Sequence, residues 1–569
     1  MLPVHTNQIK LLLVVVGFFQ FTLQGFSQTN EGTDFWFGFM EHRDVNDNTK
    51  VAMITSKFNT NGQISVPSQN WNQNFNITAN QVTIITLPNF TENIGSETID
   101  NLGIHLTSNT PTSVYIHQYQ NFRSEATTVL PTNSLGKTYY VMSYRGVQHN
   151  GSTYPSEFLI VGTEDETTFS ITVSDLTKGG QAAGNTFDIV LNQGETYQVQ
   201  AADAAGDLTG SLIQADKNFT LLSGNSWTEI PNGCYARDNL LEQMFPLETW
   251  GKQIVTIPNA EMNYDVFRIM AAEDNTIVEV AGATNTQTYF INAGEFVEYQ
   301  KSEPTYIQAN QPIQVAQFNV GEACGGHTYG DPSMVLLNSV EQTRDTVTLY
   351  NSALQDIQEN YINIIAATTD IPFITFDGAP IPATASTGTV GPNDEFSFIQ
   401  LQVSSGAHTI ISEACGIIAT AYGYGSAESY AYSGGASFNS INANPIPEGG
   451  CLNDTIYFDA KLPETRYSFF WDLGDGNTTT ESVFEHFYPS LGSYPVQLII
   501  TDECIGTVDT LNRDLVISLR QAVETIGDAV TCEGGSFGLG ATDLAGATYE
   551  WIGPNGFFSE EQFPQVFNA

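Results

Sequence analysis

The sequence contains few basic residues. Only 18 of its 569 residues are Lys or Arg, against 62 Asp and Glu, so the formal net charge is −44. A surface with this charge repels phosphate backbones and anionic headgroups, which excludes nucleic-acid binding and argues against docking on acidic lipid. Hydrophobic residues nevertheless reach 41% and aromatic residues 11%. The composition therefore differs from that of disordered chains, and the protein can bury a core in several domains.

Long apolar runs are absent except near the N-terminus. Lys10 precedes an apolar run at 11–19, and the small residues Gly25 and Ser27 follow. This pattern is typical of a secretory signal, and the run is shorter than the roughly 20 apolar residues that span a bilayer. We expect residues 1–27 to be a signal peptide that is removed after Ser27. The mature chain is then secreted or held at a cell surface, without inserting into the membrane.

Cysteine is scarce, and none of the six cysteines forms a Cys-x-x-Cys motif, so the sequence does not support a zinc ribbon or a redox motif. In an exported chain, pairing is the default. Cys451 and Cys504 are the first expected disulfide because both fall in one small predicted domain. Cys234 with Cys324 is the second candidate pair.

Catalytic motifs are also missing. The sequence has no Gly-x-Ser-x-Gly elbow and no His-Glu-x-x-His. We therefore expect no enzymatic activity and no cofactor. Calcium is the one candidate ion, because Asp44, Asn46 and Asp47 place oxygen-bearing side chains close together, although a solvated turn is the favoured interpretation. Trp71 and Trp227 could stack on sugar rings, but packing in a core is the favoured interpretation.

The sequence is rich in short strand-like segments. Runs of Val, Ile, Thr, Tyr and Phe, such as 82–87 and 496–500, alternate with Gly, Asn, Asp and Pro. This pattern predicts an all-β protein, with a repetitive β-sheet N-terminal region followed by immunoglobulin-like sandwich modules. No segment carries a sustained helical period. Residues 239–244 are the one stretch expected to form a helical turn or two.

An internal repeat organises the N-terminal region. Residues 158–167, FLIVGTEDET, resemble residues 267–276, FRIMAAEDNT, and a more diverged copy lies at 362–370. Matching Pro–Leu–Gly or Pro–Trp–Gly clusters precede the first two copies. The repeat predicts one repetitive β region over residues 28–440, built from three or more related units. The repeated Glu–Asp pairs are expected to be hairpin turns.

Several ordered blocks of this region resemble one family. The blocks are GTDFWFGF at 32–39, PTNSLGKTYY at 131–140, the strand and turn at 158–167, and GDPSM at 330–334. They resemble the IgGFc-binding-protein N-terminal-like domain. The resemblance implies a secreted multidomain protein of unassigned ligand, and it does not imply immunoglobulin binding.

A linker at 441–450 leads into a different pattern. The box WDLGDG at 471–476, followed by HFY at 486–488 and GSYPVQL at 492–498, resembles the PKD domain, an immunoglobulin-like β-sandwich, here expected over 451–520. Trp471 is expected to fill the core. Asp472 and Asp475 are expected to bond to turn backbone, and Gly474 and Gly476 to supply positive φ angles.

The last segment, 523–569, resembles the start of an immunoglobulin-like adhesin module and is expected to be incomplete. Relatives of this kind continue into a C-terminal sorting domain, through which we expect surface attachment. The sequence as a whole favours a non-enzymatic cell-surface adhesion or extracellular binding protein, whose partner is a glycan or a protein. The alternative is an accessory binding region of a secreted polysaccharide- or protein-degrading enzyme.

Overall fold

The computed structural model describes residues 29–438, 445–460, 466–504 and 508–519, with a few shorter pieces between and after them. The predicted signal peptide, residues 441–444 of the linker and most of the segment 523–569 lie outside the described residues. Apart from the short helix α1 (Glu322–Gly325) and single 3-10 turns, the described elements are strands, which confirms the all-β prediction. No helix in the described part is long and apolar enough to cross a membrane.

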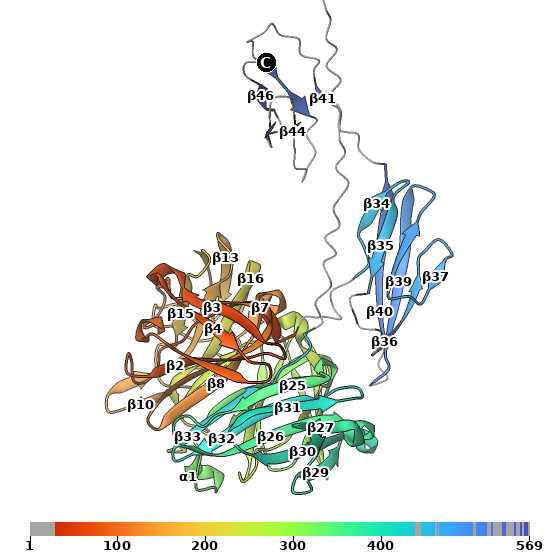
Figure 1. The fold of residues 1–569 in the computed structure, drawn as a ribbon. Helices are drawn as coiled ribbons and strands as arrows, with labels where there is room; N and C mark the ends of the chain where they lie inside the picture. The colour runs from red at the N-terminus through yellow and green to blue at the C-terminus, as the bar shows by residue number, and fades with distance from the viewer. Residues whose placement is uncertain are drawn as a thin grey trace, which may run out of the picture.

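Residues 29–438 form four units of similar size. Figure 1 shows strands of the first unit, such as β2 and β8, beside strands of the fourth, such as β25 and β33. The first unit contains β1 (Glu31–Phe37), β2 (Thr49–Thr55), β3 (Thr60–Val66), β4 (Trp71–Ile77), β5 (Val82–Leu87), β6 (Ile99–Asp100), β7 (Ile104–Gln120) and β8 (Arg123–Val129). The second contains β9 (Gly136–Tyr140), β10 (Val147–His149), β11 (Ser152–Tyr154), β12 (Ser156–Gly162), β13 (Thr167–Thr172), β14 (Thr186–Leu191), β15 (Thr196–Gln200), β16 (Leu212–Thr228) and β17 (Asp238–Gln243). The third contains β18 (Gly251–Thr256), β19 (Asp265–Ala271), β20 (Thr276–Ala281), β21 (Thr286–Ile291), β22 (Phe296–Lys301), β23 (Thr305–Asn319) and β24 (Ser333–Leu337). The fourth contains β25 (Thr346–Asn351), β26 (Ile357–Ala367), β27 (Ile374–Phe376), β28 (Ala379–Pro380), β29 (Ser386–Val390), β30 (Phe396–Val403), β31 (Gly406–Ser412), β32 (Ile418–Gly425) and β33 (Glu428–Ser433).

All four units share one topology. The first has the order β4-β3-β7-β2-β5, and the third has the matching order β21-β20-β23-β19-β22; the second follows the same scheme around β16. One half of β7 pairs with β1 and β3 and the other half with β2 and β8, so a single long strand runs through both sheets of a sandwich. In the fourth unit β31 and β32 replace this strand. The sequence repeat thus corresponds to four units, one more than the copies recognised from it.

Two local expectations were wrong. The Glu–Asp pairs are not hairpin turns, because β12 and β13 both pair with β16 and not with each other, so the segment at 163–166 crosses between sheets. Thr167 and Thr276 donate from their hydroxyls to the backbone carbonyls of Glu164 and Glu273, which fixes the same crossing in two units.

Residues 239–244 are not helical, because they lie mostly in β17 and pair with β16. Tertiary pairing overrides the weak local preference there.

Hydrophobic clusters join the units into a closed cycle. Four large clusters each combine residues from two neighbouring units, so none of them belongs to one sandwich alone. Examples, taken in order around the cycle, are Phe35 with Leu222, Leu221 with Phe318, Ile269 with Tyr422, and Tyr432 with Tyr115. Each unit therefore depends on its neighbours to bury its apolar surface.

The two ends of the cycle meet at the start of the first unit. Thr29 bridges Ser437, and the Arg344 side chain donates to the Asn30 side chain at 2.9 Å. Arg344 also lies 3.3 Å from the Glu31 carboxylate. Polar contacts between residues more than 300 positions apart thus close the cycle.

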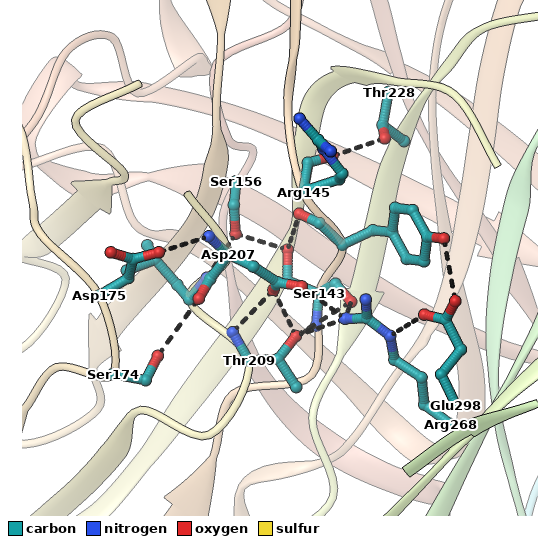
Figure 2. A network of polar contacts seen from close by, with 12 residues as sticks. Ser143, Arg145, Ser156, Ser174, Asp175, Asp207, Thr209, Thr228, Arg268 and Glu298 are labelled. Atoms are coloured by element: carbon teal, nitrogen blue, oxygen red, sulfur yellow. Dashed lines mark hydrogen bonds and ion pairs between the residues drawn. The ribbon is translucent and has the colours of Figure 1, made fainter. Parts of the chain in front are cut away.

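A buried arginine joins the second and third units (Figure 2). The Arg268 guanidinium pairs with Asp207 at 2.8 Å and with Glu298 at 2.9 Å, and it donates to the Ser143 carbonyl. Its guanidinium carbon lies 4.3 Å from the centre of the Tyr144 ring. These ion pairs raise the pKa of Arg268 against the opposing effect of burial, so the group stays charged inside the interface.

The last strand of each unit lies on the central axis of the cycle. Among the described strands, β8, β17, β24 and β33 each pair with one neighbour only, and they contact one another at their other edges, which face the axis. Side chains bond to the backbone at these edges. The Glu125 carboxylate accepts from the backbone N–H groups of Met334, at 2.8 Å, and Ala431, at 3.2 Å. Glu242 accepts from the Leu336 N–H at 3.0 Å.

These axial carboxyls are buried, which changes their acidity. Burial raises the pKa of Glu125 well above its usual value and raises that of Glu242 to about 8. Bonds from backbone N–H groups lower both pKa values but do not offset burial. At neutral pH the Glu242 carboxyl is therefore mostly protonated and still accepts through its carbonyl oxygen.

The PKD region is a separate sandwich attached by a covalent bond. It contains β34 (Gly449–Cys451), β35 (Thr455–Asp459), β36 (Tyr467–Asp472), β37 (Thr478–Thr479), β38 (Val483–Phe487), β39 (Gly492–Asp502) and β40 (Val508–Ser518). Further two-residue strands follow as β41 (Thr525–Ile526), β42 (Phe537–Gly538), β43 (Gly540–Ala541), β44 (Trp551–Ile552), β45 (Phe558–Ser559) and β46 (Gln565–Val566). Cys504 after β39 is bonded to Cys415 of the fourth unit, and Arg466 donates to the Thr343 hydroxyl beside it.

The disulfide expected between Cys451 and Cys504 is therefore wrong, whereas Cys234 is bonded to Cys324. Cys451 is opposite Ser518 at one end of β40, while Cys504 follows Thr501, which is opposite Val508 at the other end. Ten residues of strand separate the two ends, roughly 33 Å. Cys451 is free and only partly buried.

We predict that non-reducing peptide mapping of the purified protein will recover peptides that link 234 to 324 and 415 to 504. Cys451 should be alkylated by iodoacetamide before reduction, since its thiol has no partner among the described cysteines. A peptide linking 451 to 504 would contradict the structure.

We also predict that the stability of the protein falls as the pH rises from about 5 to 8. The folded state keeps the Glu242 proton up to about pH 8, whereas the unfolded state loses it near pH 4.5. The folded state binds more protons in this window, so the free energy of unfolding falls with pH. E242Q keeps the oxygen that accepts from Leu336 and should flatten the slope of Tm against pH. E279Q, at an exposed site on β20, is the control, and an unchanged slope in E242Q would refute the assignment.

Candidate binding face

In each unit one connection leads to the axial strand from the strand that pairs with it, which is β7, β16, β23 or β32. These four connections meet at one end of the axis. They are residues 121–122, 229–237, 320–332 and 426–427, and together they form a surface that we name the hairpin face. The axial strands begin there in contact with one another. The Ser124 N–H donates to Asp238 at 2.8 Å, and the Ser124 hydroxyl donates to the Ser429 carbonyl at 2.6 Å. The Asp331 N–H donates to the Ser429 hydroxyl, so all four units contribute.

Three arginines surround one tryptophan beside these connections. The guanidinium carbons of Arg43, Arg237 and Arg123 lie 4.5, 5.1 and 5.4 Å from the centre of the Trp227 ring. His149 and Tyr154, from the small hairpin β10–β11, contact its edges in T-shaped geometry. Trp227 is buried, as expected for a tryptophan that packs in a core. Each cation–π contact of this kind contributes about 0.5–2 kcal/mol.

Ion pairs orient these arginines. Asp44 binds Arg43 at 2.9 Å and Arg123 at 2.7 Å, and Glu229 binds Arg237 at 2.9 Å. Asp44 and Glu229 thus neutralise part of the charge of the three arginines. The chain has only nine arginines and a net charge of −44, so three arginines at one place are a marked departure from its average.

Three further carboxyls lie beneath the face, buried and close to one another. Burial raises the pKa of Asp331 and of Glu428 to about 8, and that of Asp238 well above its usual value. Mutual repulsion adds to the effect of burial, because neighbouring carboxylates disfavour each other's ionised form. These groups are therefore largely protonated at neutral pH and cancel little of the arginine charge.

Aromatic side chains project from the surface of the face. Tyr235 is 80% exposed and Phe122 is 59% exposed, the largest exposures among the aromatics of this end. The disulfide between Cys234 and Cys324 ties the second connection to the third directly beside Tyr235. Exposed aromatics and arginine on a fixed backbone are the composition of binding hot spots.

The calcium candidates do not converge on an ion site. Asp44 uses both carboxylate oxygens for arginines. Asn46 and Asp47 are exposed on the turn beside it, where the Asp47 N–H donates to the Asp44 carbonyl. In the part of the chain that the structure describes, no three His, Cys, Asp or Glu side chains are grouped to hold a metal.

The PKD turn residues take the positions that the motif implies. Trp471 is fully buried against Phe458 and Phe484. The Asp472 carboxylate accepts from the Gly474 N–H at 3.0 Å, and Asp475 accepts from the backbone at 477 and from His486. Gly474 and Gly476 have φ angles of 76° and 93°. The box therefore stabilises a turn.

Sequence reasoning missed Glu92, which organises the loop that carries Arg43 and Asp44. Its buried carboxylate accepts from the backbone N–H groups of His42 and Asn46, both at 2.9 Å, and lies 3.6 Å from the Lys50 amine. Glu92 lies about 50 residues from these partners in sequence and belongs to no motif, so only the fold brings them together.

Comparison with solved structures gives only weak similarities. The N-terminal four immunoglobulin domains of Dscam1 align over 68% of this chain and 98% of that chain, with 10% identity and a TM-score of 0.12. The N-terminal eight immunoglobulin domains of Down syndrome cell adhesion molecule align over 94% and 70%, with 8% identity and a TM-score of 0.13. TM-scores at this level do not indicate a shared fold.

Comparison with sequences is more informative. The human IgGFc-binding protein is 25% identical over 362 residues, which cover 62% of this chain but 6% of that protein. A PKD domain model matches residues 442–516, and a model described as IgGFc binding protein matches residues 125–423. Neither model describes a catalytic domain. Since the second model covers more than half of the chain, this chain belongs to the IgGFc binding protein family and carries a PKD domain after that region.

Proposed function

We propose that this chain is a secreted, non-enzymatic binding protein that acts in adhesion or ligand capture at a cell surface and contacts its ligand through the hairpin face. The observation that carries the proposal is the gathering of Trp227, three arginines and two exposed aromatics where all four units meet. Loops on a rigid scaffold are the usual place for recognition.

Other features support the extracellular assignment. Residues 1–27 have the sequence pattern of a signal peptide, and two disulfides join distant parts of the chain, which is typical of exported proteins. The bond between Cys415 and Cys504 fixes the PKD sandwich to the fourth unit. The sandwich can therefore serve as a spacer that follows the binding region. The partner is an extracellular glycan or protein. IgG Fc is the ligand named for the human relative, and we do not transfer it from a match to 6% of that protein.

We predict that the Y235A/F122A double variant of the mature chain loses binding at least about tenfold for ligands found on a glycan and host-protein array. Both side chains are exposed, so their removal takes away contact area without affecting the core. F290A removes a 76% exposed ring from β21, away from the face, and should leave binding unchanged. Measuring binding with and without calcium also tests whether Asp44, Asn46 and Asp47 hold a calcium ion that the ligand requires. Equal loss in F290A, or no binding by the unaltered chain in either condition, would contradict the proposal.

A further inference from the structure

An amide-rich groove lies on the outer sheet of the first unit, where β4 is the edge strand and β3 lies between it and β7. The groove has a volume of about 610 Å³. It is lined by Asn61, Gly62, Gln63, Asn74, Phe75, Asn76, Thr107, Ser108 and Asn109. None of these residues is charged, in a chain that has 62 acidic residues.

The strand register arranges the polar side chains in two rows. Asn76 is opposite Asn61, and Asn109 donates to the Asn61 side chain at 2.7 Å, which makes a row across three strands. The second row is formed by Asn74, Gln63 and Thr107. Gln63 is paired with both of its row neighbours, and rows two residues apart along a strand are separated by roughly 7 Å.

The amides are oriented by one another. Gln63 donates from its side-chain nitrogen to the Asn74 oxygen at 3.0 Å. Within the described residues, this bond leaves the Asn74 nitrogen as a donor and the Gln63 oxygen as an acceptor for a ligand. The groove thus presents donors and acceptors side by side at fixed positions.

The fold does not require amides at these positions. On the corresponding strands of the second unit the outward pair is Ser170 and Asp188, and in the third unit it is Glu279 and Thr288. An apolar ring, Phe290, occupies the next outward position of the third unit and is 76% exposed. The two rows of amide side chains therefore distinguish the first unit from the second and third, and packing does not explain them.

We propose that this groove binds a neutral oligosaccharide. Sugar hydroxyls both donate and accept hydrogen bonds, as side-chain amides do, whereas carboxylates only accept. An uncharged lining suits a ligand without charge, because no ion has to lose its water on binding. An acidic glycan would find no cation in the groove and would be repelled by the net charge of the chain. The site is separate from the hairpin face and stands whether or not that face binds a ligand.

The experiment uses residues 28–569 and a panel of neutral hexasaccharides built from glucose, mannose or galactose, with oligogalacturonate as the acidic comparison. Binding is measured by isothermal titration. We expect at least one neutral hexasaccharide to bind and oligogalacturonate not to bind. N74D keeps the size of the side chain but replaces its donor with a charged acceptor, and it should weaken binding by about tenfold or more.

The matched control is Q287E, the same change of amide to carboxylate at an exposed site on β21, which corresponds to β4; it should bind like the unaltered chain. Circular dichroism and Tm establish that both variants are folded. Absence of binding to every neutral hexasaccharide, or equal binding by N74D and the unaltered chain, would overturn the proposal.

The alternative occupant is a peptide that pairs as an added strand with the free edge of β4. A ligand that is lost in N72P but retained in N74D would show strand addition and would also overturn the proposal.

Discussion

The structure depends on satisfying the free edges of four strands that meet inside the protein. β8, β17, β24 and β33 each have one edge without a ladder partner, and a buried backbone N–H without a partner costs about as much as a lost hydrogen bond. Glu125 and Glu242 meet this requirement by accepting from the strands of other units. These bonds join the first unit to the third and fourth units, and the second unit to the third. Burial, and not the bonds themselves, raises the pKa values of the two carboxyls.

Several of the few basic residues lie at the contacts that join the four units. Arg268 and Arg344 lie at contacts between units, where each is bound by carboxylates or amides of the neighbouring unit. The three arginines around Trp227 lie where the axial strands begin. Other basic residues, such as the exposed Lys137 and Lys252, lie elsewhere on the surface. Five of the nine arginines thus lie at positions that join units or form the candidate binding face.

The sequence supported the fold class, the repeat and the PKD turn because each is a local pattern. Trp471 and the residues after it form a turn that neighbouring residues specify, and the strands at 158–162 and 267–271 alternate visibly with turn residues. The helix expected at 239–244 failed because Leu240 and Leu241 lie on opposite faces of strand β17 and pack into two different clusters, an arrangement set by the pairing with β16 and by distant units. Glu92 and Glu125 were missed because a single buried carboxyl gives no signal in sequence. The pairing of Cys451 with Cys504 failed because membership of one domain does not place two residues at the same end of it.

The most direct test of the account is amide hydrogen exchange at the axis. Met334, Leu336 and Ala431 donate their backbone N–H groups to carboxyl side chains of other units. If the four units close around the axis as described, these three amides exchange as slowly as the paired interior of β16, and E242Q leaves all three protected. Exchange as fast as that of exposed loops at these positions, in the folded protein at pH 6, would contradict the closed four-unit arrangement.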